Sequence, residues 1–374
     1  MLRALALHGG NTRAELARHL GVTRSTIGAP SARLLDLGIL RFAPDVESGG
    51  VGRFGRPGER LELAPDFCTF VSVDISIGVV RVILTDMQGA LLKQAQVAMA
   101  PADQNAEATI DVVIRLIADV IDGRDDTAGI AVSVPGVVAD TGMVVRAPII
   151  GWRDVPLQAA LSDRFAGIGP VRVFNDASLY AKTHLLTRIG PSDGNAVIVW
   201  MDAGMGGGLI VDGIPINGHT GLAGEIGHMI IGPQRGGRLQ RLEDIAGSAA
   251  LLARHAELGG VAQGIDGLRD AHRRGEDAAQ QALDEWGQAL AQGLATLTSI
   301  LEPGLMVFSG PMAAVLHDRE AETHEAYRQL LHYGTHAAHW RIHLSDDTTL
   351  ALGGAMLLRH GFLSYDAARC QEPA

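Results

Sequence analysis

Side chains that can bind a polyanion stand out near the start of the chain. They are Arg24, Ser25 and Thr26, followed by Arg53 and Arg56 in the Gly-rich stretch DVESGGVGRFGRPG. A guanidinium group pairs with a phosphate or with the edge of a guanine, and a hydroxyl group donates to phosphate oxygens. These side chains therefore predict contacts with DNA.

Short helices and a hairpin have to position these side chains. Thr12 with Glu15 predicts a capping box at the start of a second helix, and Thr23 predicts the cap of a third helix after a tight turn at 21–22. The strands ILRFA and ERLELA flank the Gly-rich stretch and predict a β-hairpin. This order is typical of a winged helix-turn-helix, here over residues 1–65. Its third helix would present Arg24, Ser25 and Thr26 to the major groove, and its wing would carry Arg53 and Arg56.

Charge also separates this segment from the remainder of the chain. Residues 1–65 hold nine arginines and six acidic residues, a net charge of +3, whereas the rest of the chain has a net charge of −14. A basic module favours phosphate because its binding releases counterions. The alternative is a three-helix packing unit whose arginines are only solvated. Pro30 removes a hydrogen bond from the third helix, so we expect that helix to be kinked or short.

Length and composition limit what the rest of the chain can be. Its 374 residues predict two or three domains, and 47% hydrophobic residues can form ordinary globular cores. Two cysteines exclude a disulfide framework and a zinc site built mainly from thiolates. No apolar run reaches the roughly 18–20 residues of a membrane helix, and the first residues do not resemble a secretory signal, so we expect a cytoplasmic protein.

After residue 65 the sequence alternates between strand and helix patterns. Three strand-length runs precede a helix at about 106–122, and strand, helix and strand follow up to residue 176. A second set starts with strands at 195–216 and continues with a long helix and the strand LMVFSGP. Two such lobes with a cleft between them predict an α/β, actin-like ATPase fold. We place the lobes at 66–190 and 191–374, with the C-terminal helix packing back on the first lobe.

Several short strings carry a resemblance to one family. They are GLAGEIGHMIIGP at 221–233, Asn175-Asp176 at a strand end, Pro135-Gly136, Gly151-Trp152 followed by VPL, and Leu242-Glu243 in RLEDIAG. With the N-terminal module they resemble, over essentially the whole chain, the ROK family. That family unites bacterial sugar kinases with winged-helix transcriptional regulators.

The resemblance implies a set of sugar-binding residues. In ROK kinases an Asn-Asp pair, the Glu and His of an ExGH motif and a later Glu hold the sugar. The matching residues here are Asn175, Asp176, Glu225, His228 and Glu243. Carboxylate and amide groups suit a ring of hydroxyls, although the same residues could only hold the lobes together. Asp176 matches the catalytic base of the kinases and is here a candidate vestigial base, while Ile149 stands where many relatives have a sugar-binding Asn.

The nucleotide and zinc motifs of the family are altered in this chain. The first phosphate loop, D-x-G-G-T in kinases, reads Asp74-Ile-Ser-Ile-Gly78, and the second, G-T-G-x-G-G-G, begins with Asp202. A carboxylate there disfavours nucleotide phosphates. The stretch 234–241 has none of the three cysteines that bind zinc in relatives, and we expect it to be a loop that orders when ligand binds. We therefore predict no catalytic residue, no metal and no cofactor.

Four histidines near the C-terminus have spacing that could imitate a metal site. They are His332, His336, His339 and His343. Without acidic residues at matching positions, we interpret them as the polar face of a helix.

These observations predict a regulator that binds operator DNA and senses a sugar or sugar derivative without phosphorylating it, most simply as a repressor. A homodimer or a dimer of dimers is expected because paired DNA half-sites match a two-fold protein. Two alternatives remain open at this point. One is an active sugar kinase with an appended DNA-binding module, and the other is a body that binds a partner protein and no sugar.

Overall fold

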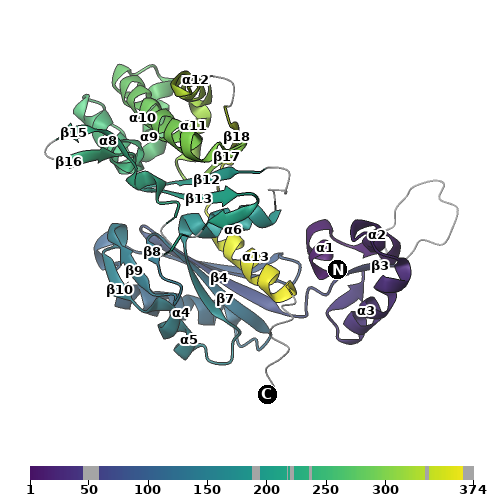
Figure 1. Ribbon diagram of the computed structural model, residues 1–374. Helices are drawn as coiled ribbons and strands as arrows, with labels where there is room; N and C mark the ends of the chain where they lie inside the picture. The colour runs from purple at the N-terminus through teal and green to yellow at the C-terminus, as the bar shows by residue number, and fades with distance from the viewer. Residues whose placement is uncertain are drawn as a thin grey trace.

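A computed structural model describes residues 1–44, 59–187, 194–216, 218–219, 223–235, 238–332 and 337–364. Figure 1 shows a small N-terminal unit beside a body in which two larger α/β parts lie one above the other. The yellow helix α13 (Thr349–Leu363) lies between the N-terminal unit and both of these parts. No helix within the described residues combines the length and the apolar character needed to span a bilayer.

The N-terminal unit contains the predicted helices and hairpin. Its helices are α1 (Leu2–His8), α2 (Arg13–His19) and α3 (Arg24–Asp36), and its sheet has the order β1 (Asn11–Thr12), β3 (Arg60–Leu63), β2 (Leu40–Phe42). The capping box is confirmed, because the backbone N–H of Thr12 donates to Glu15 (2.8 Å) and that of Glu15 donates to Thr12 Oγ1 (3.2 Å). Thr23 Oγ1 accepts from the N–H of Thr26 and caps α3.

The third helix does not stop at Pro30. It continues for six residues beyond the proline to Asp36, so the prediction of a short helix is wrong. The carbonyl of Gly28 accepts a hydrogen bond from the hydroxyl of the buried Ser31, 2.9 Å away. Pro30 leaves the carbonyl of Thr26 without its helical donor, and burial of Ile27 and Ser31 on one face of α3 offsets this loss, since tertiary packing outweighs local helix propensity.

The first large sheet has the strand order β11-β7-β4-β5-β6. Strands β4, β5 and β6 form an antiparallel meander, whereas β7 and β11 add parallel strands next to β4. Helix α4 covers β5 and β6, and α13 covers β4 and β7. The bounds are β4 (Thr69–Ser76), β5 (Val79–Asp86), β6 (Leu91–Ala98), α4 (Ala106–Ile121), β7 (Thr127–Val134) and β11 (Val171–Asn175). A small antiparallel sheet and a helix join β7 to β11: β8 (Val137–Val138), β9 (Val144–Ala147), β10 (Trp152–Val155) and α5 (Leu157–Arg164).

The second large sheet has the order β14-β13-β12-β17-β18 and repeats the antiparallel-plus-parallel arrangement of the first. Its strands are β12 (Ala196–Met201), β13 (Met205–Val211), β14 (Ile214–Ile216), β17 (Leu305–Ser309) and β18 (His339–Ile342). Helix α6 (Asp176–Thr187) packs on β12 and β13. The other helices are α7 (Glu243–Ala246), α8 (Ser248–Glu257), α9 (Gly264–Arg273), α10 (Asp277–Leu301), α11 (Ala313–Asp318) and α12 (Glu320–Leu330). The hairpin β15 (Ile230–Arg235) and β16 (Arg238–Arg241) replaces the loop expected at 234–241, and 3-10 turns occur at Pro101–Asp103, Pro148–Ile150 and Ile226–His228.

The histidine group is not a helix face. His339 opens strand β18, and His343 follows that strand, so the helical interpretation is wrong; His336 lies outside the described residues. The reason is the core, because Trp340 is buried and its ring lies 4.9 Å from that of Phe308 on the neighbouring strand. Within the described part of the chain, no group of three side chains is arranged to hold a metal ion.

Helix α13 approaches its neighbours closely because two glycines lie at the contacts. A Cβ atom on Gly353 would lie 3.0 Å from Leu179 of α6, and one on Gly354 would lie 3.1 Å from Ala131 of β7 and closer still to Ser72 of β4. At its other end, Arg3 of α1 donates to the hydroxyl of Ser364 just beyond the helix (3.1 Å).

Two glycines of α13, one closely packed and one in open space, allow a matched test of this packing. Gly354→Ala should lower the midpoint of thermal unfolding, because the added methyl group meets β4 and β7, and such overpacking costs about 1–3 kcal/mol. Gly361→Ala in the same helix has open space around the new methyl group and should be neutral or stabilising by up to about 1 kcal/mol. Equal midpoints for the two variants would contradict the close contact.

Candidate functional site

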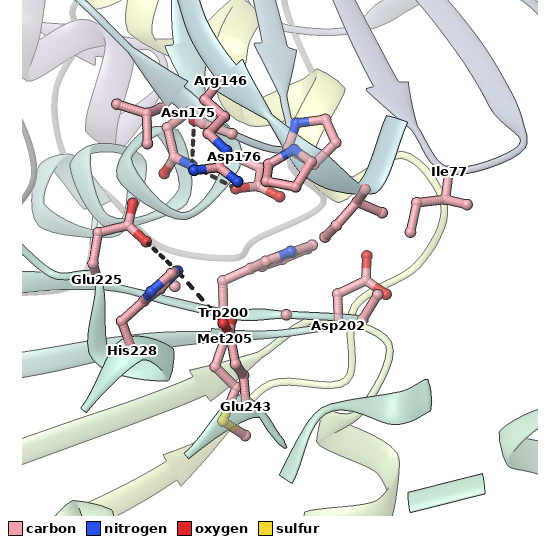
Figure 2. A pocket seen from close by; sticks show the side chains of 18 of the residues that line it. Ile77, Arg146, Asn175, Asp176, Trp200, Asp202, Met205, Glu225, His228 and Glu243 are labelled. Carbon is pink, nitrogen blue, oxygen red and sulfur yellow. Dashed lines mark hydrogen bonds and ion pairs between the residues drawn. The ribbon is translucent and has the colours of Figure 1, made fainter. Parts of the chain in front are cut away.

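A cavity of about 750 Å³ lies between the two large α/β parts. The first part contributes residues at the ends of β4, β7 and β11 and from the 3-10 turn Pro148–Ile150, and the second contributes the turn 202–206 and the segment 225–244. Figure 2 shows Asn175 and Asp176 on one side and Glu225, His228 and Glu243 on another, with Trp200 between them. The structure therefore brings all the predicted sugar-binding residues to one cavity.

Asn175 and Asp176 stand where strand β11 passes into helix α6. The side-chain oxygen of Asn175 accepts from the N–H of Ser178 (2.9 Å), and its amide donates to the carbonyl of Gly136 and to Asp176 Oδ1 (3.0 Å each). The N–H of Ala177 also donates to Asp176 Oδ1 (2.7 Å). Both bonds to Asp176 use Oδ1, and no hydrogen bond among the described residues uses Oδ2. The carboxylate is thus held in place by one oxygen, and the other can accept from a ligand hydroxyl.

His228 connects the two glutamates of the cavity. Its Nε2 lies 3.5 Å from Glu243 Oε1 and 3.9 Å from Glu225 Oε2, and Arg241 donates to its Nδ1 (2.8 Å). Because a guanidinium can only donate, Nδ1 accepts and Nε2 carries the proton that faces the glutamates. Sequence reasoning missed Arg241; the available signal was its position two residues before Glu243.

The zinc ion found in relatives does not fit this donor set. Arg241 already occupies Nδ1 of His228, and the described residues around it supply no thiolate. The positive charge beside His228 is instead the guanidinium group of Arg241, at the end of β16.

Burial and mutual repulsion disturb the acids of the cavity. Burial, together with the nearby carboxylates of Asp202, Asp74 and Glu225, raises the pKa of Asp176 to about 7, although the hydrogen bond from the N–H of Ala177 partly opposes the shift. Burial likewise raises the pKa of Asp202 and of Glu225, although His228 partly opposes the shift at Glu225. Perturbed carboxyl groups in a cleft are typical of a functional site.

The half of the cavity that corresponds to the altered phosphate loops is organised differently. Asp74 is buried, and it accepts from Ser133 (2.7 Å) and from Ser76 (2.9 Å) and pairs with the buried Arg81 (3.4 Å). Figure 2 shows Ile77 and Asp202 on the side of the cavity away from Glu225 and His228. An incoming phosphate would therefore meet an isoleucine and a carboxylate.

Three of the predicted DNA-binding residues lie on α3 of the N-terminal unit, which Figure 1 shows beside the two large parts. Arg24, Ser25 and Thr26 are exposed in the first turn of α3, and the hydroxyls of Ser25 and Thr26 both bond to that of Thr23 (2.7 and 2.9 Å). Arg53 and Arg56 lie outside the described residues.

Comparison with known proteins identifies the family. A model of the ROK family matches residues 70–361. The chain belongs to the ROK family. This ROK protein is 31% identical over 204 residues to a glucokinase of Halalkalibacterium halodurans, covering 51% of the chain but only 59% of that relative. It is 23% identical over 325 residues to the xylose repressor of Caldicellulosiruptor bescii, covering 79% of the chain and 78% of the repressor.

Solved structures show the same fold. A ROK family transcriptional regulator described as a homologue of the E. coli MLC protein superposes with a TM-score of 0.76 at 19% identity, covering 97% of this chain and 95% of that one. The ROK glucokinase of Streptomyces griseus, solved with glucose and AMPPNP, gives 0.65 at 26% identity and covers 78% of this chain and all of that one. The expected family and the actin-like body of a ROK sugar kinase are confirmed. Both repressors and kinases are among the relatives.

The raised pKa of Asp176 makes a prediction about stability and pH. Because its pKa in the folded protein is higher than in the unfolded chain, its contribution favours folding at low pH and is lost as the pH rises through about 7. Asp176→Asn keeps the acceptor oxygen and removes the charge. The variant should therefore melt above the parent protein at pH 8, by roughly 2–4 °C for each kcal/mol of relieved repulsion, and the gap should narrow at pH 5. Asp163→Asn, at an exposed position of α5, is the control and should show no pH-dependent gap.

Proposed function

We propose that this ROK protein is a sugar-responsive transcriptional regulator, in which residues 1–65 form a winged helix that binds operator DNA. The body, with lobes at 66–190 and 191–374, senses a sugar or sugar derivative and does not phosphorylate it. Binding of the ligand relieves repression. The observation that carries this proposal is the N-terminal unit, because the family match starts at residue 70 and three short helices with a small sheet precede it.

Several features of the N-terminal unit support DNA binding. The first turn of α3 exposes Arg24, Ser25 and Thr26 together, with no acidic residue in that turn. Helix N-termini and arginines suit phosphates and guanine edges. Arg53 and Arg56 lie outside the described residues, and in sequence they fall between β2 and β3, where we propose the wing. A dimer, with one unit for each half-site, matches this type of DNA reader.

The cavity supports the sensing of a polyol. Asn175, Asp176, Glu225, His228 and Glu243 together offer several acceptors and the Nε2–H donor of His228. A site built to bond hydroxyls discriminates strongly against analogues that lack them, because its own buried polar groups are then left unpaired.

A chain of close contacts offers a route from the cavity to the N-terminal unit. Asp176 begins helix α6, and the Thr183 hydroxyl of that helix donates to the carbonyl of Gly353 in α13 (3.2 Å). The far end of α13 contacts α1 through Arg3 and Ser364, and Leu363 shares a core cluster with Leu5. A ligand that binds two arrangements of the cleft with different affinity would therefore shift α6 and α13 together and change the position of the DNA-binding unit.

Operator binding and the sugar response should be affected by different substitutions. Arg24→Ala should weaken binding to an operator selected from random DNA duplexes by at least tenfold, whereas Arg115→Ala, an exposed arginine on α4, should leave it unchanged. Glu243→Gln should keep the operator affinity but shift the sugar concentration that releases the operator upward by at least tenfold, because one acceptor of a charge-assisted bond is weakened.

The measurement is fluorescence anisotropy of labelled duplex, with sugars chosen by thermal stabilisation of the full chain. An operator affinity that Arg24→Ala leaves intact would remove the support for the winged-helix assignment. An unchanged sugar response in Glu243→Gln would place the sensing site elsewhere.

An active sugar kinase is the second candidate. It is favoured by Asp176, whose pKa of about 7 suits a general base, and by the glucokinase relatives. Two features oppose it. In the first phosphate loop the carboxylate of Asp74 is already paired with Arg81 and accepts hydrogen bonds from Ser76 and Ser133. In the second phosphate loop Asp202 adds a carboxylate to the lining of the cavity.

We therefore expect no sugar-dependent turnover of ATP above background. The measurement is ADP release with Mg²⁺, ATP and each stabilising sugar, with Asp176→Asn as the matched blank. Turnover that depends on Asp176 would identify a kinase and refute the proposal that the body only senses.

A further inference from the structure

The cavity is larger than one monosaccharide requires, and its lining changes from one side to the other. The polar group Asn175, Asp176, Glu225, His228 and Glu243, here called the hydroxyl-binding half, lies on one side in Figure 2. The volume of about 750 Å³ falls in the range of drug-sized ligands. A single hexose in the hydroxyl-binding half leaves the rest of the cavity unfilled.

The remaining space has exposed apolar side chains on its wall. Ile77 is 38% exposed and Ile149 is 45% exposed, and Pro148 lies next to Ile149 in the same lining. We call Ile77, Pro148 and Ile149 the apolar half. Exposed apolar side chains that line a cavity are typical of a ligand contact rather than of ordinary surface.

The positions of the two isoleucines define the extent of this half. A Cβ atom added to Gly204 would lie 3.8 Å from Ile149 Cδ1 and 3.6 Å from Glu243 Oε2. Ile149 therefore borders the hydroxyl-binding half. Ile77 lies near Asp202, at the opposite end of the cavity from Glu225 and His228 (Figure 2).

Two polar groups accompany the apolar half. Asp202 is an acceptor for a hydroxyl group and excludes phosphate from the same space. The indole N–H of Trp200, which lines the cavity, is buried and has no acceptor among the described residues. A buried donor of this kind is unfavourable when unpaired, and an oxygen of a ligand could pair with it after a small shift of the ring.

We propose that the ligand is a sugar that carries a second ring, either a disaccharide or an aryl glycoside, with its second ring in the apolar half between Ile77 and Ile149. This inference rests on the proposed sugar sensing and specifies its ligand class. Both ligand types share the chemistry that this half would recognise, namely a ring with an apolar face.

The test uses the full chain and measures dissociation constants by titration calorimetry. The probes are glucose and xylose, their methyl and phenyl glycosides, the 1,4-linked disaccharide of each sugar and the 1,6-linked disaccharide of glucose. We expect at least one two-ring probe to bind tenfold or more tightly than the free sugar and methyl glycoside of the same series. A phenyl glycoside as the tightest probe would identify an aryl glycoside, and a linked disaccharide would identify a second sugar.

Variants locate the second ring. Ile77→Ser should reduce the ratio of two-ring to one-ring affinity at least threefold. Ile214→Ser, an isoleucine that is 63% exposed on β14 and does not line the cavity, is the matched control and should keep the ratio. Equal affinities for one-ring and two-ring probes, or an unchanged ratio in Ile77→Ser, would overturn this inference and leave sugar sensing intact. If no probe in the panel bound, both the inference and the proposed sensing would be contradicted.

Discussion

The close packing of α13 is the contact on which the rest of the structure depends. Gly353 and Gly354 let this helix approach α6 on one side and the strands β4 and β7 on the other. Strands β4 and β7 and helix α6 all end or begin at the cavity, so α13 packs on elements that carry part of its lining. The same helix ends against α1, so the cavity and the N-terminal unit share one rigid element.

Electrostatics explains why this site suits a polyol better than a nucleotide. Asp74, Asp176 and Asp202 repel one another in a poorly solvated space, and burial raises the pKa of each. Arg81 compensates Asp74 from within the chain, and Arg241 holds the imidazole of His228. Both guanidinium groups are therefore already paired with side chains of the protein. The phosphates of a nucleotide would add negative charge to a cavity that already holds several carboxyl groups.

Local patterns predicted much of the fold. The capping box at Thr12, the cap at Thr23 and the succession of strands and helices along both lobes follow from residue types that are close in sequence, and the structure confirms them. The histidine spacing misled for the same reason: a period of three or four residues resembles a helix, but the burial of Trp340 beside β17 makes the segment a strand. Likewise, the position of Arg241 two residues before Glu243 placed it near the site, but only the fold shows that it donates to His228.

The sequence by itself determined the helix caps, the alternation of strands and helices, the basic N-terminal segment and, through its motifs, which side chains belong to the candidate sugar site. Each of these depends on residues within a few positions of one another. Only the tertiary structure decided that Arg241 donates to His228, that Ile77 and Ile149 form an apolar half beside the predicted sugar-binding residues, and that α13 links this cavity to α1. Such contacts join residues that are far apart in the chain, and they arise from packing and charge compensation that no local period encodes.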